Sequence, residues 1–500
     1  MARKAALTKG KGKERLKDKP KEEDQQTKGT IVFFHPDLGI GGAERLVVDA
    51  AVGLQERGHR VVIFTNHCDP NHCFDECRDG TLDVRVRASV PIPMSIFNRL
   101  TILCAILRHI QLLIIIALTG ELANLHPEAI IADQLSAGLP LLTYLCPTSP
   151  ILFYCHFPDL LLARGRDASF FKRLYRVPFD AIEEWSMGFA QAIAVNSEFT
   201  RGIVGQTWPK LKQRTAMRVV YPCVDTSAKE KDLRKGIDKV LEGDKVILSI
   251  NRFERKKDIG LAIKAFAAVP ETQRKGVRLV IAGGYDHRID ENVQHLSELQ
   301  SLADSLSLPH TTIPSTESIS TAPPVSAAPV LFLPSVPTPT KTALLRAARL
   351  LVYTPAAEHF GIVPLEAMRA RVPVLAATTG GPVESVQDGK TGWLRDTNDV
   401  SAWSDVIAQA LSLTDNQVRA MGEAGTHRVR ELFGRDKMAE RFDDIIDEMG
   451  RGTPTRSILL NGFFNILIIV VAFAVGLVCA KGYYSVRETV VNAWVDIMRR

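Results

Sequence analysis

The chain has 500 residues, of which 46% are apolar and 24% charged, and its net charge is +6. This length predicts two or three domains, and the composition excludes a disulfide-rich miniprotein, a collagen and a wholly disordered chain. Residues 1–29 carry ten Lys or Arg against five Asp or Glu, so this tail supplies +5 of the net charge. The nearly neutral remainder argues against a nucleic-acid-binding protein whose basic surface belongs to the fold.

The basic tail 1–29 has no apolar run long enough for a secretory signal, so we expect no cleaved signal peptide. The eight Cys residues do not indicate a disulfide framework. The absence of any Asn-x-Ser/Thr acceptor fits a chain whose bulk does not face a glycosylating lumen.

A first domain is predicted over residues 30–225, where short β-branched runs alternate with helix-length spacers. This alternation is typical of right-handed βαβ units and a parallel sheet, as in a doubly wound, Rossmann-like α/β domain. The predicted strands are 30–34, 60–65, 129–133, 151–155, 192–196 and 218–222.

Within this domain, residues 100–120 form a long apolar run that is interrupted by Arg108, His109 and Gln111. An Arg near the middle makes a membrane span costly, by about 2.5–3.5 kcal/mol. The run is therefore either a helix lying in the membrane interface or a very apolar domain helix, and we favour membrane contact.

The segment NHCDPNHCFDEC contains His67, Cys68, His72, Cys73 and Cys77, which could suggest a zinc site. The Cys spacing lacks the paired Cys-x2-Cys knuckles of structural zinc sites. A polar loop is the favoured interpretation, and no metal is predicted.

A charged stretch, 226–245, has no strand pattern and is predicted to be a linker. A second doubly wound domain follows over 246–450, interrupted at 309–329 by a low-complexity insertion rich in Pro, Ser, Thr and Ala. Its predicted strands are 246–251, 277–284, 349–354 and 373–378. Because such sheets bind ligands beyond the carboxyl ends of their strands, two of them predict a cleft between the domains.

Residues 458–480 contain no charge. Twenty-three helical residues reach about 34 Å, enough to cross a hydrocarbon core of about 30 Å. We predict a transmembrane helix here, followed by a tail at 481–500. Basic residues flank both sides, so the positive-inside rule does not settle its orientation.

Three groups of residues could carry chemistry. Gly39, Gly41 and Gly42 lie between the first strand and a helix, where backbone N–H groups can approach an anion. Arg252, Arg255, Lys256 and Lys257 follow the first strand of the second domain. That run is either a solvated basic patch or a pair of cations that clamps a diphosphate.

The third group is EHFGIVPLEAM, in which seven residues separate Glu358 from Glu366. Pro364 suits the first turn of a helix, so Glu358 and Gly361 lie in the loop before it. Free N–H groups beside two carboxylates suit a phosphate and sugar hydroxyls. Another Gly-rich turn, GGPVESV, follows at 380–386 and strengthens this interpretation.

Together, GIGGAER, Arg252 with Lys257, Glu358-x7-Glu366 and GGPVES resemble the retaining GT-B glycosyltransferases that carry this glutamate motif. HPDLGIGGAERLVVDAA, YCHFPD, SINRFERKKDI, AGGYD and EHFGIVPLEAM resemble more closely the eukaryotic α-1,3/1,6-mannosyltransferases of dolichol-linked oligosaccharide assembly. The resemblance runs from about residue 30 to 450 and includes the C-terminal hydrophobic segment. It departs at the basic tail and the 309–329 insertion.

The resemblance implies roles for individual residues. Arg252 and Lys257 would hold the donor diphosphate, Glu358 the donor sugar and Glu366 the nucleotide ribose. His156, in YCHFPD, would face the sugar. The donor-binding set implied by the resemblance and by the two glycine-rich turns is Gly41, Gly42, Arg252, Lys257, Glu358, Gly361, Ile362, Val363 and Glu366. The resemblance also implies no divalent metal, because the two cations and a helix dipole replace it, and no cofactor is expected.

The implied enzyme uses GDP-mannose to add an α-1,3 and then an α-1,6 mannose to the monomannosyl-chitobiosyl diphosphodolichol precursor of N-glycans. It would lie in the endoplasmic reticulum membrane with its catalytic domains on the cytosolic face. Other early glycan-assembly transferases are possible partners; nucleic acid is not. Two alternatives stay open: another lipid-linked GT-B transferase, such as one using UDP-GlcNAc, or an inactive membrane scaffold of that fold.

Overall fold

The computed structural model describes residues 28–87, 92–96, 100–162, 170–226, 245–314 and 327–451. The predicted transmembrane helix 458–480, the tail 481–500 and nearly all of the basic tail and of the linker lie outside the described residues.

The first sheet has seven parallel strands in the order β3-β2-β1-β4-β5-β6-β7. They are β1 (Thr30–Phe34), β2 (Arg60–Thr65), β3 (Asp83–Val86), β4 (Pro127–Asp133), β5 (Ile151–Cys155), β6 (Ala192–Val195) and β7 (Ala216–Val219). The predicted doubly wound domain is confirmed. β3 was not predicted because its four residues, DVRV, are charged at alternate positions, and β7 begins two residues before the predicted strand.

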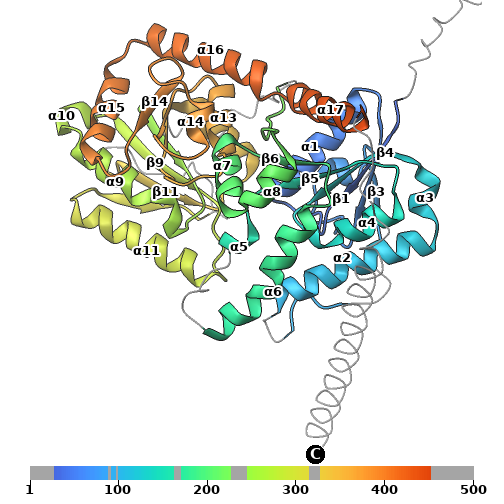
Figure 1. The fold of residues 1–500 in the computed structure, drawn as a ribbon. Coiled ribbons are helices and arrows are strands. Elements are labelled where there is room, and N and C mark those ends of the chain that lie inside the picture. The colour runs from blue at the N-terminus through green and yellow to red at the C-terminus, as the bar shows by residue number, and fades with distance from the viewer. Residues whose placement is uncertain are drawn as a thin grey trace, which may run out of the picture.

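Helices cover both faces of this sheet (Figure 1). They are α1 (Gly42–Glu56), η1 (Asp75–Cys77), α2 (Thr101–Leu118), α3 (Glu121–Leu125), η2 (Ser136–Gly138), α4 (Leu139–Leu145), α5 (Asp159–Leu162), α6 (Phe170–Met187), α7 (Glu198–Thr207) and α8 (Pro209–Arg214). Central strands buried on both faces explain why their sequences are continuous apolar runs rather than alternating ones.

Helix α2 is the one helix, among the described residues, that is long and apolar enough to cross a membrane. Leu112, Leu113 and Ile116 are fully buried against the sheet, so one face of α2 belongs to the domain core. Leu118, at its end, is exposed. The Arg108 guanidinium pairs with Asp37 at 2.5 Å. The charge that interrupts the apolar run therefore serves the fold.

The second sheet is also parallel, with seven strands in the order β10-β11-β9-β8-β12-β13-β14. They are β8 (Lys245–Ile250), β9 (Val277–Gly283), β10 (His310–Thr312), β11 (Val330–Pro334), β12 (Ala348–Tyr353), β13 (Val374–Ala377) and β14 (Gly392–Arg395). Its helices are η3 (Arg255–Lys257), α9 (Ile259–Ala268), α10 (Glu271–Arg274), α11 (Asp290–Ser305), α12 (Thr338–Ala347), α13 (Ile362–Arg369), α14 (Pro382–Ser385), α15 (Val400–Ser412) and α16 (Asp415–Leu432). The chain thus contains two domains of the same architecture.

The range predicted as an insertion, 309–329, begins too early. Its residues 310–312 form the edge strand β10, which pairs with β11. Leu308 and Ile313 on either side are buried in the core and hold this short strand in place, which composition alone does not show. Residues 315–326 lie outside the described part of the chain.

The last described helix, α17 (Arg435–Arg451), returns to the first domain and lies along α1 (Figure 1). Met438, Phe442, Ile445 and Met449 recur at helical spacing and are buried in the core of the first sheet. The predicted second domain, 246–450, therefore includes a helix that packs on the other domain.

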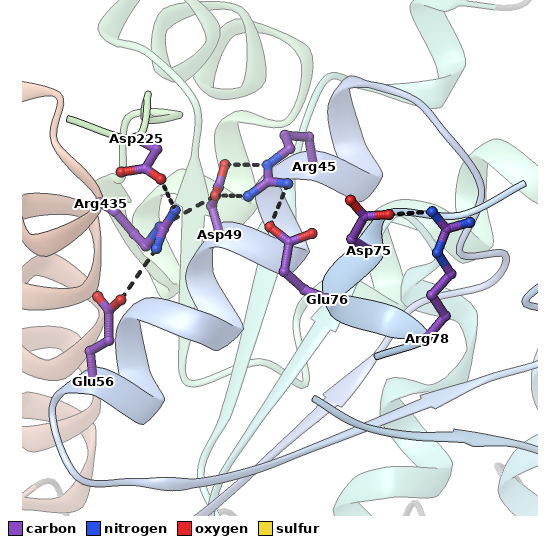
Figure 2. Close-up of polar contacts among 8 residues, drawn as sticks. All are labelled: Arg45, Asp49, Glu56, Asp75, Glu76, Arg78, Asp225 and Arg435. Atoms are coloured by element: carbon purple, nitrogen blue, oxygen red, sulfur yellow. Dashed lines mark hydrogen bonds and ion pairs between the residues drawn. The ribbon is translucent and has the colours of Figure 1, made fainter. Parts of the chain in front are cut away.

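An ionic network fixes the start of α17 (Figure 2). The Arg435 guanidinium lies 2.8 Å from Asp225, 3.2 Å from Glu56 and 3.5 Å from Asp49. Asp49 is buried and also pairs with Arg45, which lies one turn earlier in α1. Partnered charges of this kind avoid the cost of an isolated buried carboxylate, so the network orients α17 against α1.

Candidate active site at the interdomain boundary

Lys257 and Glu358 form an ion pair at the carboxyl edge of the second sheet. Lys257 ends the short turn after β8, and Glu358 lies in the loop after β12, the neighbouring strand. Tyr353 donates a hydrogen bond to the same carboxylate at 3.0 Å. Burial would raise the pKa of Glu358, but the charge and hydrogen bond of Lys257 lower it below its ordinary value. Glu358 is thus ionised, mostly buried and able to accept further hydrogen bonds.

The backbone around Glu358 explains why positions 361 and 381 are glycine. Gly361 has φ of +83°, a conformation that side chains with a Cβ rarely adopt, and it is the residue before α13. A Cβ on Gly381 would lie 2.2 Å from the Cα of Phe360, and the Gly381 N–H donates to the Glu358 carbonyl at 2.8 Å. The GGPVES turn therefore packs directly on the glutamate loop, which confirms that the two motifs share one edge of the sheet.

Glu366 lies in the second turn of α13, and Ile362 and Val363 open that helix, with their side chains packed partly into the core. The Glu366 Oε1 atom lies 2.6 Å from the Lys341 ammonium of α12. Its Oε2 atom is buried and has no hydrogen-bond partner among the described residues. One oxygen of Glu366 is thus held by a cation while the other is left to accept a donor.

Arg252 occupies the same edge but has a different partner. Its side chain is 63% exposed, and its guanidinium lies 2.9 Å from Glu254. Glu254 also contacts the neighbouring Lys256 at 3.1 Å. Arg255 turns away to Glu298 of α11. Of the four cations in this run, Lys257 pairs with Glu358, Arg252 and Lys256 share Glu254, and Arg255 pairs with a helix outside the run.

Gly41 and Gly42 form the start of α1, as predicted. Neither residue has a positive φ, and a Cβ on Gly42 would meet no atom within 4 Å. The fold itself therefore does not require glycine at position 42. This leaves open space beside the first N–H groups of a 15-residue helix.

His156 follows β5 at the carboxyl edge of the first sheet and belongs to a chain of contacts with two residues that sequence reasoning did not identify. Its Nε2 atom lies 2.6 Å from Oδ1 of Asp133, the last residue of β4. Asp133 Oδ2 lies 2.8 Å from Nδ1 of His35, which follows β1. The rule that ligands bind at the carboxyl ends of parallel strands could have identified both residues.

Contacts across the domain boundary bring the two edges together. The rings of Phe157 and His359 stack with centroids 3.7 Å apart, and the Ser197 hydroxyl donates to the His359 carbonyl at 2.5 Å. Phe157 follows His156 in sequence, and His359 follows Glu358. The structure therefore brings His156 of the first domain toward the Lys257–Glu358 pair of the second.

Glu384, in the GGPVES turn, makes a further contact across this boundary. Its carboxylate accepts hydrogen bonds from the backbone N–H groups of Glu198 and Phe199 at 2.8 and 2.9 Å. These are the first two N–H groups of α7, which have no partner within the helix. A side chain of one domain thus caps a helix of the other.

The His67–Cys77 loop does not assemble a metal-ligand set. Among the described residues, no group of three or more His, Cys, Asp or Glu side chains has the arrangement to hold a metal ion. Burial and a hydrogen bond to Cys73 raise the pKa of the Cys68 thiol to about 11.

Two protein families match the chain along its length. Residues 40–228 match the family described as Glycosyltransferase Family 4, and residues 230–317 and 327–428 match Glycosyl transferases group 1. The boundary between the two matches falls where the first sheet domain ends.

Several fungal proteins are similar over most of the chain. The Neurospora crassa protein named Alpha-1,3/1,6-mannosyltransferase alg-2 is 55% identical over 465 residues, which cover 91% of this chain and 96% of that relative. The Saccharomyces cerevisiae protein named Alpha-1,3/1,6-mannosyltransferase ALG2 is 43% identical over 444 residues, which cover 85% of this chain and 86% of that relative.

Solved structures share the arrangement of the two domains. The sucrose-phosphate synthase of Thermosynechococcus elongatus superposes with a TM-score of 0.62 at 18% identity, covering 84% of this chain and 99% of that one. WaaG, a glycosyltransferase involved in lipopolysaccharide biosynthesis, gives 0.54 at 16% identity, covering 83% and 99%. At such identities the likeness establishes the fold alone.

Proposed function

The chain belongs to the family of alpha-1,3/1,6-mannosyltransferases, and on this premise we propose that it transfers mannose from GDP-mannose to a dolichol diphosphate oligosaccharide. Its relatives, which are named alpha-1,3/1,6-mannosyltransferases, favour this function over a UDP-GlcNAc-dependent transferase or an inactive scaffold of the same fold. The observation that carries the proposal is the Lys257–Glu358 pair, which lies beside the Lys341–Glu366 pair at the edge of one sheet.

In the proposed complex, the donor diphosphate lies at the carboxyl end of β8, against Lys257 and Arg252. Negative charge grows on the diphosphate as the bond to the sugar breaks, and fixed cations stabilise that charge more in the transition state than in the bound substrate. The N–H groups of Gly361, Ile362 and Val363 at the start of α13, and those beside Gly41 and Gly42 at the start of α1, add partial positive charge at two helix ends.

The two glutamates recognise hydroxyls. Glu358 accepts from hydroxyls of the mannose, and Glu366 from the ribose, because an ionised carboxylate only accepts hydrogen bonds. The unpartnered Oε2 atom of Glu366 suits this second role. His156 lies on the opposite side, at the edge of the first sheet, and faces the sugar in the proposed complex.

Neither the sequence motifs nor the resemblance assigns a side chain as nucleophile on the sugar. We therefore propose front-face transfer, in which the acceptor hydroxyl oxygen bonds to the anomeric carbon on the face from which the diphosphate leaves. The bond between that carbon and the diphosphate oxygen breaks, and the hydroxyl proton passes to a phosphate oxygen. The α configuration of the donor is retained, and no metal or cofactor takes part.

We further propose that the enzyme works at the endoplasmic reticulum membrane with both domains on the cytosolic face. A polyprenyl acceptor does not leave the bilayer, so an anchored enzyme meets it more often. The uncharged run 458–480 and the exposed end of α2 support this placement. Assembly with other early glycan-assembly transferases stays a prediction.

The test supplies membranes containing the protein with radiolabelled GDP-mannose and the monomannosyl lipid acceptor. The expected result is two added mannoses, in α-1,3 and then α-1,6 linkage, with no label transferred from UDP-GlcNAc. Arg255→Ala is a matched control, since this neighbour of the clamp pairs with α11 instead. Absence of label above that in membranes lacking the protein would disprove the function.

A further inference from the structure

Three polar side chains meet at the carboxyl edge of the first sheet, although they are far apart in sequence. His35 follows β1, Asp133 ends β4 and His156 follows β5. β1, β4 and β5 are successive neighbours in the sheet. Because all strands run parallel, their carboxyl ends converge on one place, and the three side chains form a line that runs from the core toward the domain boundary.

The exposed fraction of the side chain increases along this line from His35 to His156. The side chains of His35 and Asp133 are 0% and 1% exposed, whereas that of His156 is 23% exposed. A buried carboxylate without partners is strongly unfavourable. Here each oxygen of Asp133 has one imidazole within 2.8 Å. The innermost ring also lies 4.0 Å from Glu44, which belongs to the first turn of α1 beside the glycine-rich turn.

The contacts place one nitrogen of each imidazole ring against the Asp133 carboxylate. Burial would raise the pKa of Asp133, but the charges and hydrogen bonds of His156 and His35 lower it to about 2. Asp133 is therefore ionised near neutral pH and only accepts hydrogen bonds. The nitrogens that face the carboxylate are Nδ1 of His35 and Nε2 of His156, so a hydrogen on each of them stabilises the ionised Asp133. A neutral His156 ring with its hydrogen on Nε2 has a lone pair on Nδ1.

We propose that Asp133 and His35 are positioning residues for the transfer reaction. Asp133 holds the His156 ring so that Nδ1 accepts a hydrogen bond from a sugar hydroxyl at the domain boundary. His35 in turn holds Asp133 in place from the core. The inference rests on the proposed function, because it needs a sugar at this boundary, and it adds two residues that no sequence motif assigns.

A second buried pair in the same domain serves as a control for a purely structural role. His59 and Asp443 lie 2.6 Å apart and are both buried. His59 immediately precedes β2 and Asp443 belongs to α17, so this pair lies at the amino end of a strand, apart from the sheet's carboxyl edge. If buried histidine–carboxylate pairs mattered only for folding, Asp133→Asn and Asp443→Asn would behave alike.

The decisive experiment measures kcat and KM for GDP-mannose in membranes, normalised to folded protein by thermal unfolding. Asp133→Asn keeps the shape of the side chain but lets either nitrogen of His156 carry the hydrogen. We expect kcat to fall about 10- to 100-fold with little change in KM, since misoriented partners cost about this much. Asp443→Asn should keep the wild-type kcat per folded molecule.

Two His35 variants keep the proposal testable if Asp133→Asn does not fold. The amide of Asn can donate from nearly the position of Nδ1, so His35→Asn should retain several-fold more activity than His35→Leu, which removes the donor. Equal kcat for the two His35 variants, or a wild-type kcat for Asp133→Asn, would overturn the inference. A wild-type protein that transfers no mannose would instead refute the proposed function, so the two failures are distinguishable.

Discussion

The two sheet edges that meet at the domain boundary carry their charges differently. At the edge of the first sheet, Asp133 is enclosed by two imidazoles and is inaccessible. At the edge of the second, Lys257, Glu358, Lys341 and Glu366 form two pairs whose side chains are 14–27% exposed. The charge at the edge of the first sheet is fully buried, whereas the charges at the edge of the second sheet are partly exposed to solvent.

This difference suggests a division of labour. Each of these ion pairs is open to solvent on one side, so a ligand can reach it and take the place of one partner. A diphosphate can take the place of Glu358 on Lys257, and hydroxyls can bind the oxygens that become free. A buried carboxylate with two fixed partners cannot be exchanged in this way, and it serves instead to orient a neighbouring side chain.

The largest expected effect tests the exchangeable edge. Lys257→Ala should lower kcat/KM for GDP-mannose by at least about 100-fold, because it removes a cation aimed at the leaving group. Radiolabel transfer in membranes measures this, with Arg255→Ala as the control. A Lys257→Ala enzyme within about threefold of wild type would show that the pair is structural.

A smaller effect separates binding from chemistry at the same edge. Glu366→Gln should raise KM for GDP-mannose about 10-fold while changing kcat less than about threefold, because the ribose lies away from the reacting carbon. Glu298→Gln, which alters an exposed glutamate on α11, is the matched control. A fall in kcat with unchanged KM would place Glu366 at the reacting centre instead.

A contact between the two edges gives the next prediction. Glu384→Ala removes the cap that the second domain places on α7, and loss of a cap costs about 1 kcal/mol. We expect a lower urea midpoint and faster proteolysis at the domain boundary. Glu423→Ala, at an exposed position of α16, should change neither. Identical proteolysis of both variants would mean that the cap does not hold the domains together.

The smallest effect concerns another buried carboxylate, Asp443, and the pH dependence that it gives to the stability of the protein. Burial would raise the pKa of Asp443, but its hydrogen bonds to Lys28, Arg57 and His59 lower it to about 2. An Asp in an unfolded chain titrates near 3.9. The stabilisation is therefore present above about pH 4 and is lost as the pH falls toward 2.

Asp443→Asn should remove this dependence, at a cost of about 1 kcal/mol near neutral pH once solvent screening is considered. Unfolding by urea between pH 2 and pH 7 measures it. An unaltered slope of stability against pH in Asp443→Asn would assign the acid sensitivity to other carboxylates.

Much of the fold followed from periodicity. Runs such as ILFYC at 151–155 are bounded by helix-length spacers, and β5 coincides with the predicted range. Four strands were missed. β3 is charged at alternate positions, β10 and β14 have only three and four residues, and β11, VLFLP, directly follows the range that was predicted as an insertion. β10 has three residues and is held by Leu308 and Ile313 rather than by any pattern of its own.

The sequence by itself determined the two parallel sheets and the positions of Lys257, Glu358 and Glu366, because strand periodicity and motif spacing are local properties. Only the tertiary structure decided that Lys341 pairs with Glu366, that His35 and Asp133 stand behind His156, and that α17 returns to the first domain. Such contacts join residues that are far apart in sequence, from 23 positions for Asp133 and His156 to 415 positions for Lys28 and Asp443 of α17. No local pattern encodes such pairs. They arise because parallel strands end at a common edge and because the apolar face of α17 is buried in the core that α1 and the first sheet form.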